Sequence, residues 1–366
     1  MTVRVLVVDD SPTMRALLSR QLGSDPEIEV VGAASCAAEA RVMIREHNPD
    51  VVTLDIEMPG MNGLQFLEKI MRLRPMPVII VSGITKSGCE TTICALELGA
   101  LDCYPKPQGA THASLYANSS SLANIVKNAA NASCSQPSLA ASANRISQPI
   151  PSIQNDGTRL IAIGASTGGV EALHHMLPVF PEDCPPTLIV QHIGAGFAPA
   201  LADRLDQQCK AKVQLAEPGL TLQSGHIYIA PSNNRHMVLK GGNTLHVRSI
   251  FSDPSDGHCP SVDALFNSVA KTLGSSAVGI LLTGMGADGA RGLLAMRQGG
   301  ARTIAQDKAS SVIYGMPRAA AELNAAELIL PLTHIAAHAL SGVLHRSEIN
   351  PNKSDNDFQP VIAVRN

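Results

Sequence analysis

The sequence predicts an α/β protein with two consecutive domains, each built on a parallel sheet with helices on both faces. A chain of 366 residues favours two domains over one. Short apolar strands alternate with helical patterns from about residue 3 to 130 and again from about 158 to 340, as expected of parallel α/β units. Tryptophan is absent and aromatic residues make up 3% of the chain. The cores must therefore be packed by Val, Ile, Leu and Ala, which suits parallel sheets.

The composition also narrows the classes of partner and compartment. The formal net charge is −3, whereas a nucleic-acid-binding protein usually carries a basic face. The eight cysteines form no CxxC pair and no zinc spacing, which indicates reduced thiols in a cytoplasmic protein. The apolar run near the N-terminus reaches acidic residues at Asp9. It is too short for a signal peptide or a membrane span, so we expect no membrane insertion.

Composition changes between the two halves and again at the end of the chain. Residues 133–157 are rich in Ser, Ala, Asn, Gln and Pro and lack apolar periodicity. This predicts a flexible linker rather than an ordered loop. Residues 349–366 are predicted to be a disordered tail. The expected domains are therefore residues 1–132 and 158–348.

Acidic, hydroxyl and basic side chains stand at the ends of four predicted strands in the N-terminal half. The strands cover residues 4–8, 51–54, 78–81 and 101–104, and the residues at their ends are Asp9, Asp10, Asp55, Ser82 and Lys106. Because the carboxyl ends of parallel strands meet at one edge of a sheet, these side chains should converge. Clustered carboxylates suit Mg²⁺, and a single lysine can neutralise a phosphoryl group. The cluster predicts Mg²⁺-dependent phosphoryl transfer to Asp55, although either acid alone would be interpreted as a helix cap or turn residue.

This half of the chain resembles the receiver domain of two-component response regulators. The resemblance rests on Val-Val-Asp-Asp-Ser-Pro at 7–12, Leu-Asp-Ile-Glu-Met-Pro-Gly-Met-Asn-Gly at 54–63 and Lys-Pro at 106–107. It implies a flavodoxin-like fold with Asp55 as phosphoacceptor. It also implies Mg²⁺ bound by Asp9, Asp10, Asp55 and a main-chain oxygen of Glu57, with Ser82 and Lys106 in the switch.

One position departs from the receiver pattern. The family usually has an aromatic residue three positions before the lysine, and here that residue is Cys103. Tyr104 follows it, but strand alternation predicts that it points to the other face of the sheet. We therefore expect a weaker response of Ser82 to phosphorylation.

A glycine-rich turn follows the first predicted strand of the C-terminal half. The strand at 160–163 leads into Gly164-Ala165-Ser166-Thr167-Gly168-Gly169, and a helical pattern follows. The turn predicts an exposed Ser166 near a helix N-terminus, where free N–H groups favour a developing oxyanion. Such turns also bind phosphate or simply reverse the chain, so the motif alone does not decide for a nucleophile.

Two further strands end at a base and an acid. His192 follows the strand beginning at Thr187, and Asp288 lies in the glycine-rich turn after the strand at 277–282. A triad of Ser166, His192 and Asp288 is the favoured interpretation. The alternatives are another histidine as base, Asp288 as a helix cap, and Asp307 as the acid; the rival histidines are His174, His175, His226, His236 and His258.

These motifs resemble the chemotaxis protein-glutamate methylesterase family. The resemblance rests on residues 163–169, Gln-His at 191–192, Leu-Thr-Gly-Met-Gly-Ala-Asp-Gly at 282–289 and Tyr-Gly-Met-Pro-Arg-Ala-Ala at 314–320. It implies hydrolysis of glutamate methyl esters on the cytoplasmic helices of chemoreceptors, often with glutamine deamidation, without a cofactor for the esterase. It also implies a chemotaxis histidine kinase as phosphodonor, an oxyanion-hole N–H from Met285, and a supporting role for Thr167. The usual basic residue before Pro-Ser-Val-Asp is replaced here by Cys259.

Two other classes of function compete with this interpretation. A response regulator with a DNA-binding output would need a basic helix-turn-helix after the linker, and the sequence shows neither. A nucleotide-binding module would use residues 164–169 to hold phosphate, but no lysine follows the glycines and the spacing is not GxGxxG.

Overall fold

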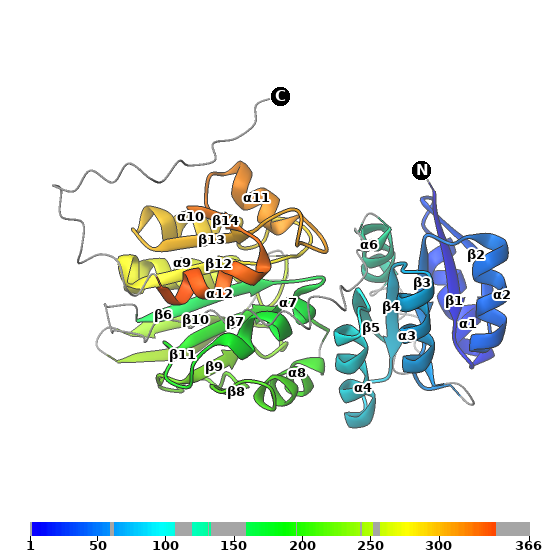
Figure 1. Ribbon diagram of the computed structural model, residues 1–366, viewed down its shortest axis with the longest axis horizontal. Coiled ribbons are helices and arrows are strands. Elements are labelled where there is room, and N and C mark those ends of the chain that lie inside the picture. Colours follow the sequence, from blue (N-terminus) through cyan, green and yellow to red (C-terminus); the bar gives the residue numbers. More distant parts are fainter. Residues whose placement is uncertain are drawn as a thin grey trace.

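The computed structural model describes residues 2–58, 62–106, 119–130, 132, 159–194, 196–241, 244–251 and 257–341. The predicted linker and tail lie outside the described residues. Two α/β domains follow each other along the chain and lie against each other (Figure 1). None of the helices in the described part of the chain combines the length and hydropathy that a membrane-spanning segment needs.

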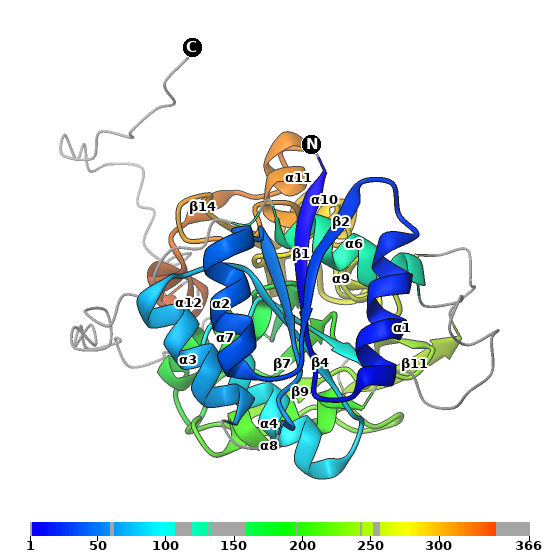
Figure 2. The same ribbon diagram turned by 90° about the vertical axis from the view of Figure 1, so that its right-hand side faces the viewer.

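The N-terminal domain is a parallel sheet of five strands in the order β2-β1-β3-β4-β5. Its strands are β1 (Val3–Val8), β2 (Ile28–Ala34), β3 (Val51–Leu54), β4 (Val78–Ser82) and β5 (Asp102–Pro105), and its helices are α1 (Pro12–Gly23), α2 (Ala37–His47), α3 (Gly63–Leu73), α4 (Lys86–Glu97) and α6 (Ser119–Ala129). Helices α1 and α6 cover one face of the sheet, and α2, α3 and α4 cover the other (Figure 2). The strand order reverses direction at β1, so β1 and β3 carry the functional edge.

The C-terminal domain has a parallel sheet of seven strands in the order β14-β13-β12-β6-β7-β9-β8. These strands are β6 (Leu160–Ala165), β7 (Thr187–Gln191), β8 (Lys212–Leu215), β9 (His226–Ile229), β12 (Ala277–Leu281), β13 (Arg302–Gln306) and β14 (Leu328–Leu330). An antiparallel hairpin of β10 (Arg235–Gly241) and β11 (Leu245–Phe251) lies outside this sheet. The apolar-strand pattern did not predict this hairpin.

Helices cover both faces of the seven-stranded sheet. They are α7 (Gly169–Met176), α8 (Phe197–Asp206), α9 (Val262–Leu273), α10 (Ala290–Gln298), α11 (Met316–Glu322) and α12 (Leu332–Ser341), with short 3₁₀ turns at η1 (Leu177–Val179) and η2 (Gly274–Ser276). Side chains alternate along β6: Ile161 and Ile163 pack with α7, α8 and α12, whereas Leu160 and Ala162 pack with α9, α10 and α11. The sheet is therefore buried on both sides, as its apolar composition predicts.

Burial predicts a large difference between two phenylalanines of the catalytic domain. Phe266 on α9 is fully buried, whereas Phe251 is 77% exposed at the end of the hairpin. Phe266→Ala should lower the free energy of unfolding by about 3–5 kcal/mol, because it leaves a cavity in the core. Phe251→Ala should cost under about 1 kcal/mol, because it loses only a surface contact with Arg235. Urea denaturation of both variants measures the difference, and equal losses would contradict the packing described for α9.

Candidate functional sites at two strand edges

The predicted nucleophile, base and acid follow three adjacent strands of the catalytic sheet. β12, β6 and β7 are neighbours, and Asp288, Ser166 and His192 lie in the segments that follow them. From β6 the chain proceeds to β7 on one side and returns to β12 on the other. Ligand sites of open α/β sheets form at such a change of direction.

Ser166 lies in a tight turn between β6 and α7. Its N–H donates to the carbonyl oxygen of Thr283 over 3.0 Å, and Gly168 completes the turn with φ +76°, a conformation that favours glycine. Only 8% of Ser166 is exposed. The predicted exposure of this serine is wrong in the full chain, because Leu101 and Asp102 of the N-terminal domain line the same pocket.

His192 is oriented by Asp288. Its Nε2 lies 2.9 Å from Asp288 Oδ2, and its main-chain N–H donates to the carbonyl oxygen of Ala165, next to Ser166. Its Nδ1 is buried and has no hydrogen-bond partner among the described residues. A proton on Nε2, directed at the carboxylate, leaves the lone pair on Nδ1. Nδ1 is therefore the ring atom that can accept a proton from Ser166.

The carboxylate of Asp288 is surrounded by donors. Oδ1 accepts from Ser261 Oγ and Asp263 N over 2.9 Å each, while Oδ2 accepts from Val262 N over 2.8 Å in addition to its contact with His192. Burial alone would raise the pKa of Asp288, but the hydrogen bond and charge of His192 and the two main-chain N–H groups lower it to about 2. Because these donors belong to the first turn of α9, the helix dipole also favours the ionised form.

The rival acids and bases take part in other local contacts. The N-cap of α10 is Gly289 rather than Asp288. Asp307 accepts hydrogen bonds from the N–H and hydroxyl of Ser310, three residues further along the chain. His226 stacks on Tyr228, with ring centroids 5.9 Å apart.

His258, one of the rival bases, lies directly beside His192. The two rings stack with centroids 4.4 Å apart and planes 17° apart. Partial burial and the neighbouring His192 lower the pKa of His258, so its ring is neutral at neutral pH. It therefore covers one face of the base without placing a second positive charge there. Cys259, the departure from the family pattern, follows it and is half-buried.

Gln191 is a site residue that the sequence analysis missed. Its Nε2 donates to the carbonyl oxygens of Ser166 over 2.8 Å and His192 over 2.9 Å. The amide thus ties the turn of the nucleophile to the segment of the base. Its position directly before His192, at the end of a buried strand, was the signal that could have identified it.

Thr167 and Met285 belong to two segments that lie close to Ser166. Thr167 donates its hydroxyl to Asp102 Oδ2 of the N-terminal domain over 2.6 Å. A Cβ at Gly284 would come within 2.7 Å of Ser166 Cβ, so the segment leading into Met285 lies against the serine. The main-chain N–H of Met285 makes no hydrogen bond to the described residues.

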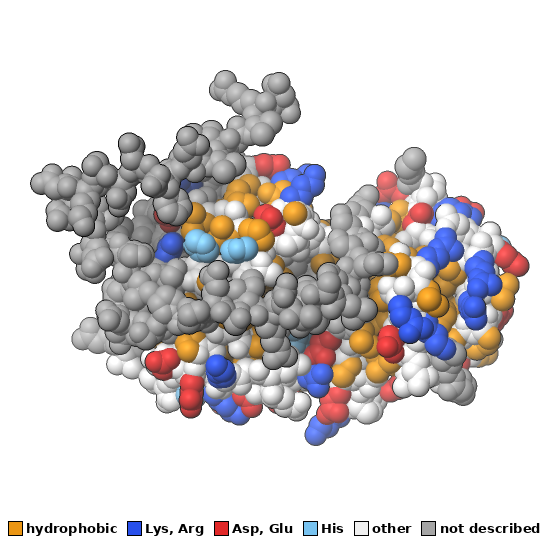
Figure 3. All heavy atoms as spheres, in the orientation of Figure 1, with side chains coloured by type: hydrophobic (Ala, Val, Ile, Leu, Met, Phe, Trp, Pro, Cys, Tyr) orange, Lys and Arg blue, Asp and Glu red, His pale blue; other side chains and the backbone are white. Residues whose placement is uncertain are grey.

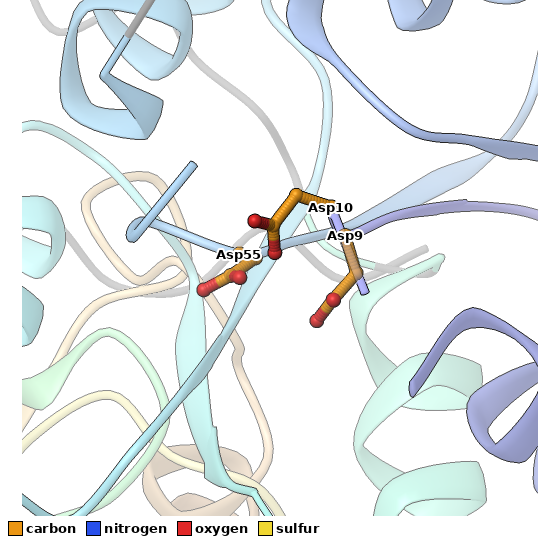
Figure 4. Close-up of side chains that lie close together, drawn as sticks. All are labelled: Asp9, Asp10 and Asp55. Carbon is orange, nitrogen blue, oxygen red and sulfur yellow. The ribbon is translucent and has the colours of Figure 1, made fainter. Parts of the chain in front are cut away.

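The second predicted cluster forms at the carboxyl edge of the N-terminal sheet. Oxygen atoms of Asp9, Asp10 and Asp55 lie within 4.8 Å of one another, and the side chains of Asp10 and Asp55 point toward each other (Figure 4). Lys106 Nζ lies 3.0 Å from Asp9 Oδ2 and 2.7 Å from Asp55 Oδ2. Asp9 and Asp55 are almost completely buried, so their negative charges have little water around them.

The charges of this cluster are incompletely offset. Burial raises the pKa of Asp55, and the charge of Asp9 adds to the rise, although Lys106 opposes it. Burial alone would lower the pKa of Lys106, but its bonds and charge interactions with the two carboxylates raise it. Apart from the ion pair with Lys106, Asp9 Oδ2 has no hydrogen-bond partner among the described residues. A hard divalent cation would supply the missing positive charge, so the donor set fits Mg²⁺.

The remaining receiver residues lie around this cluster. Glu57 donates its main-chain N–H to Asp55 Oδ1 over 3.1 Å, which places its peptide beside the acids. Ser82 is fully buried at the end of β4. Cys103 packs with the core on the face of α2, α3 and α4, whereas Tyr104 packs on the opposite face and accepts from Gln21 Nε2. The two side chains thus point to opposite faces, as strand alternation predicts.

The N-terminal domain contacts the catalytic domain through α4 and β5. Glu97 on α4 accepts from Arg204 Nε and from a terminal nitrogen of the same guanidinium over 2.8 Å each, and His174 Nε2 lies 3.0 Å from the same carboxylate. Burial alone would raise the pKa of Glu97. Its interactions with Arg204, His174 and Gln208 outweigh that effect and lower the pKa. The carbonyl oxygen of Leu101 accepts from Gly168 N over 3.3 Å. These contacts hold the receiver surface over the turn that carries Ser166.

Comparisons with known proteins agree with both halves of this description. Residues 5–115 match the response regulator receiver domain, and residues 161–339 match the CheB methylesterase domain. Protein-glutamate methylesterase/protein-glutamine glutaminase 1 of Caulobacter vibrioides is 51% identical over 92% of this chain and 97% of its own length. The corresponding protein of Rhizobium etli is 51% identical over 94% of this chain and 98% of its own length. The Thermotoga maritima CheB methylesterase catalytic domain has 34% identity and a TM-score of 0.49, covering 50% of this chain and 97% of that one.

The two sites define a response regulator whose output domain is a hydrolase. The sequence identity with these relatives over most of the chain gives a more specific assignment. This chain belongs to the protein-glutamate methylesterase/protein-glutamine glutaminase family. The predicted family, α/β fold and hydrolase class are confirmed. The residues considered for a nucleotide-binding turn, and those of a DNA-binding output, fall within the methylesterase match.

The environment of Asp288 predicts a specific dependence of stability on pH. The pKa of Asp288 is about 2 in the folded protein, against an ordinary value of 3.8. Its stabilising contribution is therefore complete above about pH 4 and is lost as the pH falls toward 2. This loss amounts to about 2 kcal/mol, and Asp288→Asn should remove it, giving a shallower rise of unfolding free energy with pH.

Asp263 provides the matched control, because burial raises its pKa. Its ionisation destabilises the fold as pH rises, so Asp263→Asn should make the rise with pH steeper. Urea denaturation between pH 2 and 5 measures both slopes. The same slope for the wild type and Asp288→Asn would contradict the environment described for Asp288.

Proposed function

We propose that Ser166, His192 and Asp288 form the triad with which this chain hydrolyses glutamate γ-methyl esters on chemoreceptor helices. The observation that carries the proposal is the ring of His192, whose Nε2 is held by Asp288 while its buried Nδ1 has no hydrogen-bond partner among the described residues. That arrangement suits a general base oriented by a carboxylate. The names of the curated relatives supply the ester substrate and also glutamine deamidation.

The reaction follows from the chemistry of the three groups. Ser166 Oγ attacks the ester carbonyl carbon while its proton passes to His192 Nδ1. The same proton then passes to the departing methoxide, which leaves as methanol, and the glutamyl group remains esterified to Ser166. Water, losing a proton to His192, attacks this ester and releases the glutamate carboxyl group and free Ser166. Ammonia replaces methanol as the leaving group when the substrate is a glutamine amide.

The negative charge on the tetrahedral oxygen needs donors close to Ser166. The main-chain N–H of Met285 is proposed as one of them, because the preceding residue Gly284 lies against Ser166 and this N–H makes no hydrogen bond to the described residues. Thr167 is proposed to support substrate positioning once its hydroxyl is released from Asp102.

Ser166→Ala and His192→Ala should each lower methanol release from methylated receptor by at least about 1,000-fold, because triad members act as a unit. Both residues lie at strand ends rather than in the packed core, so the variants should remain folded. His226→Ala is the control, since His226 contacts Tyr228 on another strand, and it should retain full activity. Retained activity in either triad variant would refute the assignment.

We further propose that residues 1–132 form a receiver that regulates residues 158–348 through a linker at 133–157, with a tail at 349–366. Asp55 is the proposed phosphoacceptor and Lys106 the residue that neutralises the phosphoryl group. Asp9, Asp10, Asp55 and a main-chain oxygen of Glu57 would hold Mg²⁺, which supplies charge stabilisation during phosphoryl transfer. A chemotaxis histidine kinase would be the phosphodonor.

The unphosphorylated receiver is proposed to inhibit the esterase by covering it. Asp102 binds the hydroxyl of Thr167, adjacent to the nucleophile, and Glu97 anchors the same surface to Arg204. A receptor helix cannot reach Ser166 while these contacts persist, since Ser166 is buried beneath them. Figure 3 shows acidic and basic side chains on the visible face of both domains. The polar contacts of Glu97 and Asp102 with the catalytic domain fit a reversible interface.

Breaking the contact between Arg204 and Glu97 should activate the full chain. Arg204→Ala removes two charge-assisted hydrogen bonds to Glu97 and should raise the unphosphorylated activity roughly threefold to tenfold. Lys212→Ala is the control, because Lys212 pairs with Asp206 inside the catalytic domain, and it should leave the activity unchanged. A small phosphodonor with Mg²⁺ should activate the wild type but not Asp55→Asn. Wild-type activity in Arg204→Ala would refute inhibition through this surface.

A further inference from the structure

The Pro-Ser-Val-Asp segment at the start of α9 has no role in the mechanism above, yet it surrounds the triad acid. Three donors from consecutive residues of this segment bind the Asp288 carboxylate: Ser261 Oγ, Val262 N and Asp263 N. They lie 2.8–2.9 Å from its two oxygen atoms. Among them only the hydroxyl of Ser261 belongs to a side chain, so only this donor can be removed by substitution.

The Ser261 hydroxyl is held in one orientation. It is the N-cap of α9 and accepts a hydrogen bond from Ala264 N over 3.2 Å, so its own proton is free to point at Asp288 Oδ1. The main-chain N–H of Ser261 donates to His236 Nδ1 over 3.0 Å, and both residues are buried. Neither the backbone nor the side chain of Ser261 therefore has much freedom to move.

The contact between α9 and α10 is reciprocal. Asp288, which stands before α10, accepts donors from the first turn of α9. Asp263, in the first turn of α9, accepts from Gly292 N of α10 over 2.6 Å. Each helix N-terminus thus receives a carboxylate from the other helix, in the place where a helix favours negative charge. This exchange of carboxylates between α9 and α10 fixes the position of Asp288.

We propose that Ser261 is a positioning residue of the esterase: its hydroxyl fixes the carboxylate of Asp288 by Oδ1, so that Oδ2 faces Nε2 of His192. This proposal rests on the triad proposed above. Without the hydroxyl, Oδ1 keeps only the N–H of Asp263, and the carboxylate can turn away from the imidazole. A carboxylate that has turned away stabilises the protonated imidazole less.

Two measurable effects follow for Ser261→Ala in the full-length chain. kcat for methanol release, with a phosphodonor and Mg²⁺ present, should fall roughly tenfold, the effect of losing one hydrogen bond to a charged group. The acidic limb of the kcat/KM profile should move to lower pH. A merely structural helix cap would lower stability without moving this limb. The other titratable groups around the pair are His258, Asp263, His236 and Asp102 of the receiver, and none of them is altered in the variant.

Three further variants separate positioning from capping. Ser261→Thr keeps a hydroxyl and should restore kcat and the pH profile. Ser261→Gly, which is tolerated at N-caps much better than alanine, should lose activity as Ser261→Ala does. Ser268→Ala is the matched control on the same helix: its hydroxyl binds Leu239 N, away from the triad, and kcat should not change. Labelling of Ser166 with a fluorophosphonate normalises every rate to folded enzyme.

The experiment distinguishes failure of the proposal for Ser261 from failure of the proposed triad. Loss in Ser261→Ala and Ser261→Gly, recovery in Ser261→Thr and a displaced acidic limb would support the proposal. Rates and pH profiles of Ser261→Ala that match those of Ser268→Ala would overturn it, even if Asp288→Asn is inactive. Full activity in Asp288→Asn would overturn the triad itself, and this inference with it.

Discussion

A carboxylate that is buried away from water must be offset by donors or cations, because desolvation otherwise favours its protonated form. Both sites of this protein are built on that constraint, and they meet it differently. Asp288 receives four donors and has a pKa of about 2. Burial and the nearby charge of Asp9 raise the pKa of Asp55, although Lys106 and the N–H of Glu57 oppose the rise. The donors around Asp288 already offset its negative charge. The charge of Asp55 is offset only in part, which suits a site that binds a cation.

This difference matches the role proposed for each acid. The triad acid should keep one charge and one orientation through every turnover, and a helix N-terminus supplies fixed donors that cannot rearrange. A phosphoacceptor must instead change its bonding when it is modified. Lys106 is suited to that role because it contacts both Asp9 and Asp55 and can follow the added charge. The same type of sheet edge thus supports a rigid site in one domain and a changeable site in the other.

Much of both sites could be predicted from the sequence, because apolar strands that end in polar residues reveal the carboxyl edge of a parallel sheet. Asp9, Asp55, Ser166 and His192 were found in this way. The contribution of Ser261 could not be predicted, since the sequence does not show that α9 begins beside the loop of Asp288. Gln191 was missed because a glutamine that binds two main-chain carbonyls leaves no periodic signal. The hairpin of β10 and β11 was missed because its strands, unlike the central strands β6, β7 and β12 of the parallel sheet, are not continuously apolar and buried.

The burial of Ser166 was mispredicted for a different reason: residues of both domains line its pocket. The contact between the domains includes segments close to Ser82 and Lys106, the residues proposed for the switch. Ser82 ends β4, and a Cβ at Gly196 of the catalytic domain would come within 2.4 Å of Ile84 Cγ2, two residues after Ser82. Lys106 follows β5, whose first residue is Asp102. A rearrangement of Ser82 and Lys106 around a phosphoryl group would therefore act on segments that already touch the catalytic domain. Since the interface relies on polar contacts such as that of Asp102 with Thr167, a small displacement is enough to break them, because hydrogen bonds weaken steeply with distance and angle.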